Sequence, residues 1–179
     1  MAHPLLDHQI VRFGFGGGIT PFNLDQVNPA SYNLTIGNTA KIETRDGFQH
    51  LDLSRYSMAN PYNLGPGGFI LTDVNELIAI PPDMEAQVVL RSSAARRGWD
   101  HCLAGYVDPG YGFGRDNASR LTLEFKNCLR YGFLPIFPGL QLVQLRLFKL
   151  DDEPLEHYGK TGRYGGAQTV EGCKDTRLW

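Results

Sequence analysis

The sequence has no excess of positive charge, no long apolar run and no paired cysteines. Its 17 Lys and Arg residues are balanced by 19 Asp and Glu residues, so we expect no basic face that binds the phosphates of duplex nucleic acid. The apolar runs are short, and Met1–Thr20 lacks the pattern of a signal peptide, so we expect no membrane span and a cytoplasmic location. The three cysteines are widely spaced, which favours neither a disulfide framework nor a metal knuckle.

Short apolar runs separated by glycine, proline and asparagine predict a mainly β protein. The predicted strands are Ser31–Ile36, Phe69–Thr72, Leu77–Ile80, Ala86–Leu90, Leu121–Phe125, Phe133–Phe137 and Leu140–Phe148. Many short strands with turns between them favour a jelly roll or a distorted barrel. A chain of 179 residues with 42% hydrophobic composition can bury one substantial core, and no linker or repeat divides it. The glycine run Gly14–Gly18 lacks dinucleotide-loop spacing, so we interpret it as a flexible turn.

A candidate anion site follows the strand that ends at Leu90. Ser92 and Ser93 begin a short helical turn, where a serine can cap free backbone amides and leave the positive end of the helix facing outward. Such an arrangement suits a phosphate group, and Arg91 and Arg96 could add forked contacts. A capped surface helix with solvated arginines explains the same residues equally well.

Two carboxylates lie near this turn in the sequence. Glu124 alternates with Leu123 and Phe125, which by itself favours an outward-facing residue on a strand. If Glu124 is partly buried instead, its pKa is raised and it can both accept and donate a proton. Asp108 begins a typical Asp-Pro-Gly turn, which can present Asp108 and Tyr111 to one pocket.

The order RSSAAR, AGYVDPGYG and LTLEFKN resembles the dCTP deaminase and dUTPase superfamily, most closely its deaminase branch. The segments Gln26–Asn38, Gly67–Met84 and Pro138–Phe148 extend the resemblance over nearly the whole chain. The resemblance implies a distorted jelly-roll β-barrel of the dUTPase-like type with few short helices, spanning residues 1–150. It also implies a mobile C-terminal lid at residues 151–179 and a homotrimer with active sites between subunits.

The resemblance implies a hydrolase that deaminates dCTP, or a related deoxycytidine nucleotide, to dUTP and ammonia, and this is our main expectation. None of the five histidines has a glutamate two residues later, so the His-x-Glu zinc signature is missing and no zinc is expected. By resemblance Glu124 is the proton shuttle, Ser92 and the Ala104 carbonyl hold the attacking water, and Arg96 assists. The expected substrate contacts are Arg91, Ser93, Asp108, Tyr111 and Gln144, with Tyr158, Arg163 and Gln168 from the lid. Magnesium is expected to arrive on the triphosphate, with no metal site in the protein.

Two alternatives remain open. Asp108 matches the residue that holds the attacking water in dUTPases, and Tyr106 resembles an aromatic residue of bifunctional deaminase-dUTPases, so dUTP hydrolysis to dUMP is the first alternative. A catalytically silent homologue that senses nucleotides or binds a partner is the second. The long spacing between Asp108 and Glu124, and Asn33 where the family has an aspartate, keep this second alternative open.

Overall fold

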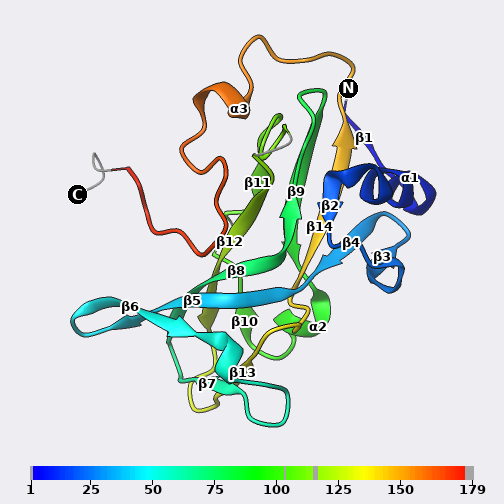
Figure 1. Cartoon of the computed structure of the whole chain (residues 1–179). Coiled ribbons are helices and arrows are strands. Elements are labelled where there is room, and N and C mark those ends of the chain that lie inside the picture. Colours follow the sequence, from blue (N-terminus) through cyan, green and yellow to red (C-terminus); the bar gives the residue numbers. More distant parts are fainter. Residues whose placement is uncertain (1, 103, 115–116, 176–179) are drawn as a thin grey trace.

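The computed structural model describes residues 2–102, 104–114 and 117–175, and these residues form two antiparallel sheets of six strands each (Figure 1). The first sheet has the order β11-β9-β14-β4-β3, with β1 also paired to β14. Its strands are β1 (His3–Pro4), β3 (Val27–Asn28), β4 (Ser31–Leu34), β9 (Met84–Leu90), β11 (Tyr106–Val107) and β14 (Val143–Lys149). The second sheet has the order β10-β12-β8-β5-β6, with β2 paired to β8. Its strands are β2 (Ile19–Thr20), β5 (Ile36–Thr44), β6 (Gly47–Asp52), β8 (Phe69–Ile78), β10 (Trp99–Asp100) and β12 (Ser119–Asn127).

Short elements complete the described part of the chain. A two-stranded ladder joins β7 (Tyr62–Leu64) to β13 (Leu134–Ile136). The helical segments are α1 (Asp7–Phe13), η1 (Gly14–Gly18), η2 (Leu24–Gln26), η3 (Leu53–Arg55), α2 (Ser92–Ala95) and α3 (Tyr158–Thr161). The expected mainly β, distorted jelly-roll architecture with few short helices is confirmed, although the two sheets do not close into one hydrogen-bonded ring in this part of the chain. None of the described helices is long and apolar enough to cross a membrane.

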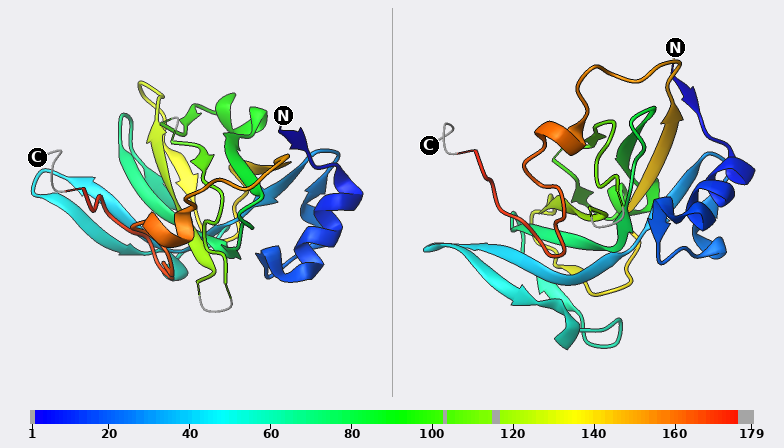
Figure 2. Two further views of the ribbon diagram at one scale, coloured as in Figure 1. Left: turned by 90° about the horizontal axis from the view of Figure 1, so that it is seen from above. Right: turned by 45° about the horizontal axis from the view of Figure 1, so that its top comes forward.

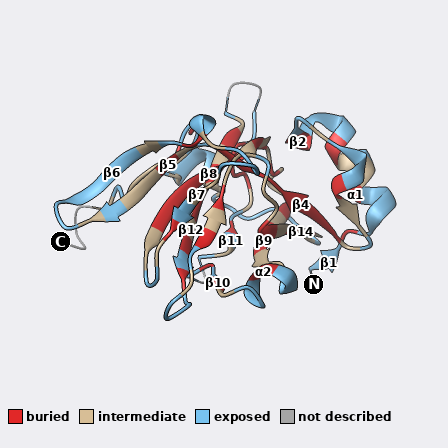
Figure 3. Ribbon diagram, turned by 90° about the horizontal axis from the view of Figure 1, so that it is seen from below, coloured by how far each residue is buried: buried red, intermediate tan, exposed pale blue. Residues whose placement is uncertain are grey.

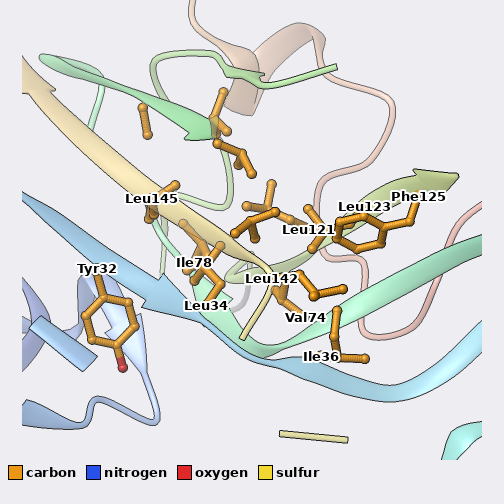
Figure 4. Close-up of a cluster of buried hydrophobic side chains, with 14 of the residues drawn as sticks. Tyr32, Leu34, Ile36, Val74, Ile78, Leu121, Leu123, Phe125, Leu142 and Leu145 are labelled. Carbon is orange, nitrogen blue, oxygen red and sulfur yellow. The ribbon is translucent and has the colours of Figure 1, made fainter. Parts of the chain in front are cut away.

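The core lies between the two sheets and explains the alternating pattern of β12. Leu121, Leu123 and Phe125 point into the same apolar cluster as Val74 of β8 and Leu145 of β14 (Figure 4). Phe125 is fully buried, so truncation to alanine should cost about 3–5 kcal/mol. In Figure 3 buried positions follow β12, β9 and β4, whereas β6 is largely exposed.

The predicted strand Phe69–Thr72 and the first two residues of the predicted strand Leu77–Ile80 belong to the single strand β8, which ends at Ile78. Asp73 and Glu76 interrupt the apolar pattern, yet both are buried because neighbouring groups satisfy them. Asp73 accepts a hydrogen bond from the Thr39 amide (3.0 Å), and Glu76 accepts from the hydroxyl of Thr35 (2.8 Å). Buried carboxylates are tolerated where such partners exist, and the sequence pattern does not reveal those partners.

Other boundaries also differ from the prediction. Ser31–Ile36 is divided at Thr35 because β4 and β5 belong to different sheets. The glycine run is not a simple flexible turn. It continues α1 as one wide helical turn that ends at Gly17, whose φ of 90° a side chain rarely adopts. The hairpin of β5 and β6 was not predicted, since its charged and polar residues carry no strong apolar alternation.

The C-terminal segment packs against the second sheet on the side of the β5–β6 hairpin (Figure 2). Its polar composition suggested a loose terminus, but Ala167 and Val170 are buried. The Val170 amide donates to the Thr39 hydroxyl (3.0 Å), and the Arg120 amide donates to the Ala167 carbonyl (2.7 Å). This segment therefore covers part of β12, while its mobility remains a prediction.

Candidate functional site

A cavity of about 630 Å³ lies where the C-terminal segment crosses β8, β11 and β12. The sheet contributes Phe69, Leu71, Thr122 and Glu124, the loop before β11 contributes Ala104, and the turn after β11 contributes Asp108 and Tyr111. The C-terminal segment contributes Tyr158, Tyr164, Ala167 and Glu171. Residues distant in the sequence thus enclose one apolar chamber that holds a few polar groups, which is the usual character of a small-molecule site.

Glu124 is the most perturbed carboxylate of this chamber. Its side chain is 28% exposed, and burial raises the pKa of Glu124 to about 7. In the described structure its Oε2 atom has no hydrogen-bond partner. A carboxyl group with a pKa near neutrality can take up and release a proton under ordinary conditions, so the geometry favours the partly buried interpretation over the outward-facing one.

His101 lies beside Glu124 and was missed by the sequence interpretation. Its Nε2 atom is 3.7 Å from Glu124 Oε2 and likewise has no hydrogen-bond partner in the described structure. Burial lowers the pKa of His101, so the ring is neutral near pH 7. The pairing of β10 with β12 brings the two residues together, since Asp100 pairs with Lys126 and His101 follows next. Predicting that pairing would have revealed His101.

The turn after β11 presents Asp108 and Tyr111 to the same chamber, as expected. The Tyr111 amide donates to the Asp108 carbonyl (3.1 Å), and Gly110 supplies the positive φ of 83° that the turn requires. Burial, followed by the charge of Glu85, raises the pKa of Asp108. The buried Tyr111 ring lies 5.2 Å from the Tyr158 ring of the C-terminal segment. Tyr158 therefore covers the face of the turn.

The residues expected to bind phosphate divide into two groups. Ser92, Ser93 and Arg96 are exposed on or beside α2, and none of them lines the chamber of Glu124. The expected serine cap is absent, because Arg91 occupies the N-cap position and no side chain caps the amides. Of the residues expected to hold the attacking water, only Ala104 lines the chamber.

Arg91 and Gln144 belong to a separate polar network. Arg91 Nη1 donates to the carbonyl and to the side-chain oxygen of Gln141 (both 3.1 Å). Gln141 also accepts from the Asn33 amide group (3.2 Å), and Asn33 in turn accepts from Gln144 (3.3 Å). Asn33, where the family has an aspartate, is thus fully engaged by amides. The network holds Arg91 in place outside the chamber of Glu124.

Two of the three expected lid contacts point elsewhere. Arg163 forms an ion pair with Asp175 (3.2 Å), and the Gln168 amide group donates to the Ala118 carbonyl (3.0 Å). Only Tyr158 lines the chamber. Ala118 belongs to the long connection between Asp108 and Glu124, so this connection contacts the C-terminal segment at Ala118.

A second cavity of about 580 Å³ adjoins the first and shares Tyr106, Asp108 and Tyr158 with it. Glu85 and Glu156 add further carboxylates to its wall. The described residues contain no group of three or more His, Cys, Asp or Glu side chains arranged to hold a metal ion. A divalent ion that arrives on a nucleotide therefore finds no carboxylate cage in this part of the chain.

The two sheets and the carboxylate chamber place the protein in the class of dUTPase-like β proteins with a nucleotide-sized site. A solved structure with the same fold is the 2'-deoxycytidine 5'-triphosphate deaminase from Agrobacterium tumefaciens, with a TM-score of 0.66 and 21% identity. The match covers 83% of this chain but 49% of that chain.

Residues 8–150 match the family model described as dCTP deaminase-like, and the chain belongs to this family. Relatives named "dCTP deaminase, dUMP-forming" occur in Nanoarchaeum equitans, with 27% identity over 90% of this chain and 89% of the relative, and in Streptomyces coelicolor, with 30% identity over 90% and 87%. A third, from Dictyoglomus thermophilum, is 34% identical over 76% of this chain and 74% of the relative. The expected family and enzyme class are confirmed.

The names of these relatives correct one expectation. Our main expectation was a deaminase that releases dUTP, and the relatives are described as forming dUMP. That expectation is therefore wrong, and the bifunctional alternative fits better. The resemblance of Tyr106 and Asp108 to residues of dUTPases and bifunctional enzymes had pointed to this alternative, but the Asp-Pro-Gly turn has an ordinary structural explanation as well.

Proposed function

We propose that this protein converts dCTP to dUMP in two hydrolytic steps at one site, first releasing ammonia and then diphosphate. The observation that carries the proposal is that Glu124 and Asp108 line the same chamber. One carboxylate suits each step. Membership in the dCTP deaminase-like family and the dUMP-forming relatives support the same sequence of reactions.

In the first step Glu124 takes one proton from the attacking water and gives it to the ring nitrogen, and it then takes the second proton from the new hydroxyl group at C4 and gives it to the departing ammonia. Its pKa of about 7 makes both transfers accessible without a large penalty. Water attack at C4 gives a tetrahedral centre, and loss of ammonia leaves the uracil ring. Ala104 lines the chamber, and in this proposal its carbonyl holds the water.

In the second step Asp108 orients a water toward the α-phosphorus, and diphosphate leaves. Tyr111 packs beneath the deoxyribose in this proposal, a position in which a 2'-hydroxyl group would be crowded. Magnesium would arrive on the triphosphate and neutralise part of its charge. The C-terminal segment closes over the bound nucleotide.

The phosphate-binding residues come from a neighbouring subunit in this proposal. Arg91 and Gln144 do not line the chamber of their own chain, yet the network around Gln141 fixes them in place. A homotrimer with a site at each junction would bring Arg91, Ser92, Ser93 and Arg96 of one copy to Glu124 of the next. The phosphate-binding residues of one subunit and the chamber of the next would then form one complete site.

The direct test is incubation of the purified chain with dCTP or dUTP and magnesium, with ammonia, diphosphate and each nucleotide measured separately. We expect dCTP to yield ammonia, diphosphate and dUMP in equal amounts. Release of diphosphate from dUTP without release of ammonia from dCTP would mean that the protein is a dUTPase and not a deaminase. Binding without either product would instead identify a silent nucleotide-binding homologue.

The shared site is tested by mixing two inactive variants. Glu124→Gln subunits alone should be inactive, and Arg91→Ala subunits alone should turn over little dCTP when its concentration is kept well below their raised Michaelis constant. Mixed trimers contain junctions where an intact Glu124 meets an intact Arg91, so activity should return after subunit exchange. No recovery in trimers shown by mass to be mixed would contradict a site between subunits.

A further inference from the structure

A tyrosine and two carboxylates lie together on one face of the β9–β11 ladder. Tyr106 pairs with Gln87, and Val107 pairs with Ala86. Continuing this antiparallel register by one residue sets Asp108 opposite Glu85. Side chains two residues apart share a face of a strand, so Glu85, Tyr106 and Asp108 all face the second cavity, which they line.

Tyr106 is held in place although it is 62% exposed. Its hydroxyl donates to Glu85 Oε2 at 2.9 Å, and hydrogen bonds to a charged acceptor are stronger than neutral ones. Tyr106 lines both cavities, so its ring forms part of the boundary between them. Loss of the Glu85 contact would free this ring to move away from Asp108.

Glu85 also acts on Asp108 directly. Two carboxylates opposite each other in a ladder repel, and the charge of Glu85 adds to burial in raising the pKa of Asp108. Among the described residues, no lysine or arginine forms an ion pair with either carboxylate. The other ionisable groups on the walls of the two cavities around Asp108 are Tyr106, Tyr111, Arg120, Glu124, Glu156, Tyr158, Tyr164, Glu171 and Cys173.

We propose that Glu85 is a positioning residue for the diphosphate-releasing step, where its hydrogen bond from the Tyr106 hydroxyl fixes Tyr106 beside Asp108. This inference rests on the proposed second step at Asp108. Glu85 lines only the second cavity and not the chamber of Glu124. It therefore acts on diphosphate release and leaves deamination unchanged.

Two substitutions separate the two effects of Glu85. Glu85→Gln keeps an acceptor for Tyr106 but removes the charge, so the rise of diphosphate release with pH should begin at lower pH, with the maximal rate within about threefold. Tyr106→Phe keeps the charge but removes the contact, so the pH profile should stay in place while the rate falls about tenfold. In Glu85→Gln, ammonia release from dCTP should remain within about twofold of the unmodified protein, because Glu85 does not line the chamber of Glu124. Glu156→Gln, which changes a carboxylate of the same cavity, is the matched control and should change neither rate.

The outcomes distinguish this inference from the proposed function. If the unmodified protein forms dUMP and Tyr106→Phe releases diphosphate at the unmodified rate, the role of Glu85 is wrong. If Glu85→Ala lowers both steps equally, Glu85 has only a structural role. If the unmodified protein forms no dUMP at all, the proposed second step fails. Carboxyl NMR titration of Asp108 then still tests the Glu85 contact, because its pKa should fall in Glu85→Gln and an unmoved value would reject the coupling.

Discussion

His101 Nε2 and Glu124 Oε2 lie 3.7 Å apart, and in the described structure neither atom has a hydrogen-bond partner. Buried polar atoms are normally satisfied, so this pair marks a place where a water or a polar group of the substrate completes the contacts. The distance suits a bridging molecule better than a direct bond.

Substitution of Glu124 should change both activity and the pH dependence of stability. Glu124→Gln should abolish ammonia release while dCTP binding stays within about tenfold, because an amide keeps the shape but carries no proton. Folding raises the pKa of Glu124 from 4.5 to about 7, so the unmodified protein loses stability as pH rises through this range. The loss is at most about 3 kcal/mol, reduced because the side chain is partly exposed.

Thermal unfolding at pH 4, below the unfolded pKa of 4.5, and at pH 8.5 checks the stability claim. The two proteins should unfold alike at the lower pH, and Glu124→Gln should be the more stable protein at the higher pH. Equal stability at both values would mean that the pKa of Glu124 is not raised. Undiminished ammonia release would exclude Glu124 as the proton shuttle.

His101 offers a second test of the chamber. His101→Phe preserves ring packing against Phe125, whose centroid lies 5.4 Å away, but removes the nitrogen that faces Glu124. We expect the rate constant of deamination to fall at least about tenfold with little change in the Michaelis constant. A less polar neighbour should also raise the pKa of Glu124, which would move the ascending limb of the profile to higher pH. His8→Phe, on the exposed helix α1, is the control, and equal kinetics in both variants would reject a role for His101.

Arg91 and Arg96 should affect different kinetic constants. Arg91→Ala should raise the Michaelis constant for dCTP about tenfold or more, since an arginine–phosphate contact is a strong charge-assisted bond. Arg96→Ala should mainly lower the rate constant. The neighbouring exposed Arg97 provides the control, because Arg97→Ala should leave the kinetics unchanged. If Arg91→Ala and Arg96→Ala also leave both kinetic constants unchanged, α2 is an ordinary surface helix.

The C-terminal segment should respond to nucleotide. Val170 is 3% exposed, so Val170→Asp places a charge where an apolar side chain packs and should release the segment. We expect faster cleavage by trypsin after Lys174 or Arg163 and lower turnover, with the folded sheets retained. Thr169→Asp, at an exposed neighbour, should change neither. A non-hydrolysable dCTP analogue should slow cleavage of the unmodified protein, and cleavage at one rate with and without the analogue would exclude a lid.

The sequence alone determined the mainly β architecture, because apolar alternation and turn residues are local signals. Leu121, Leu123 and Phe125 identified the inner face of β12, and Asp-Pro-Gly identified the turn that carries Asp108. Motif order also identified the family. Each of these signals is carried by residues close together in the chain, so they can be predicted from the sequence without knowledge of the tertiary structure.

Only the tertiary structure decided which distant residues meet. The pairing of β10 with β12 brought His101 to Glu124, and the ladder of β9 with β11 brought Glu85 to Tyr106. The C-terminal segment turned Arg163 toward Asp175 and Gln168 toward Ala118, away from the chamber where motif resemblance had put them. Burial set the pKa of Glu124, because the cost of charge depends on the solvent excluded by all the elements around it. Strand pairing and burial both depend on residues that are far apart in the sequence, so no local sequence pattern predicts them.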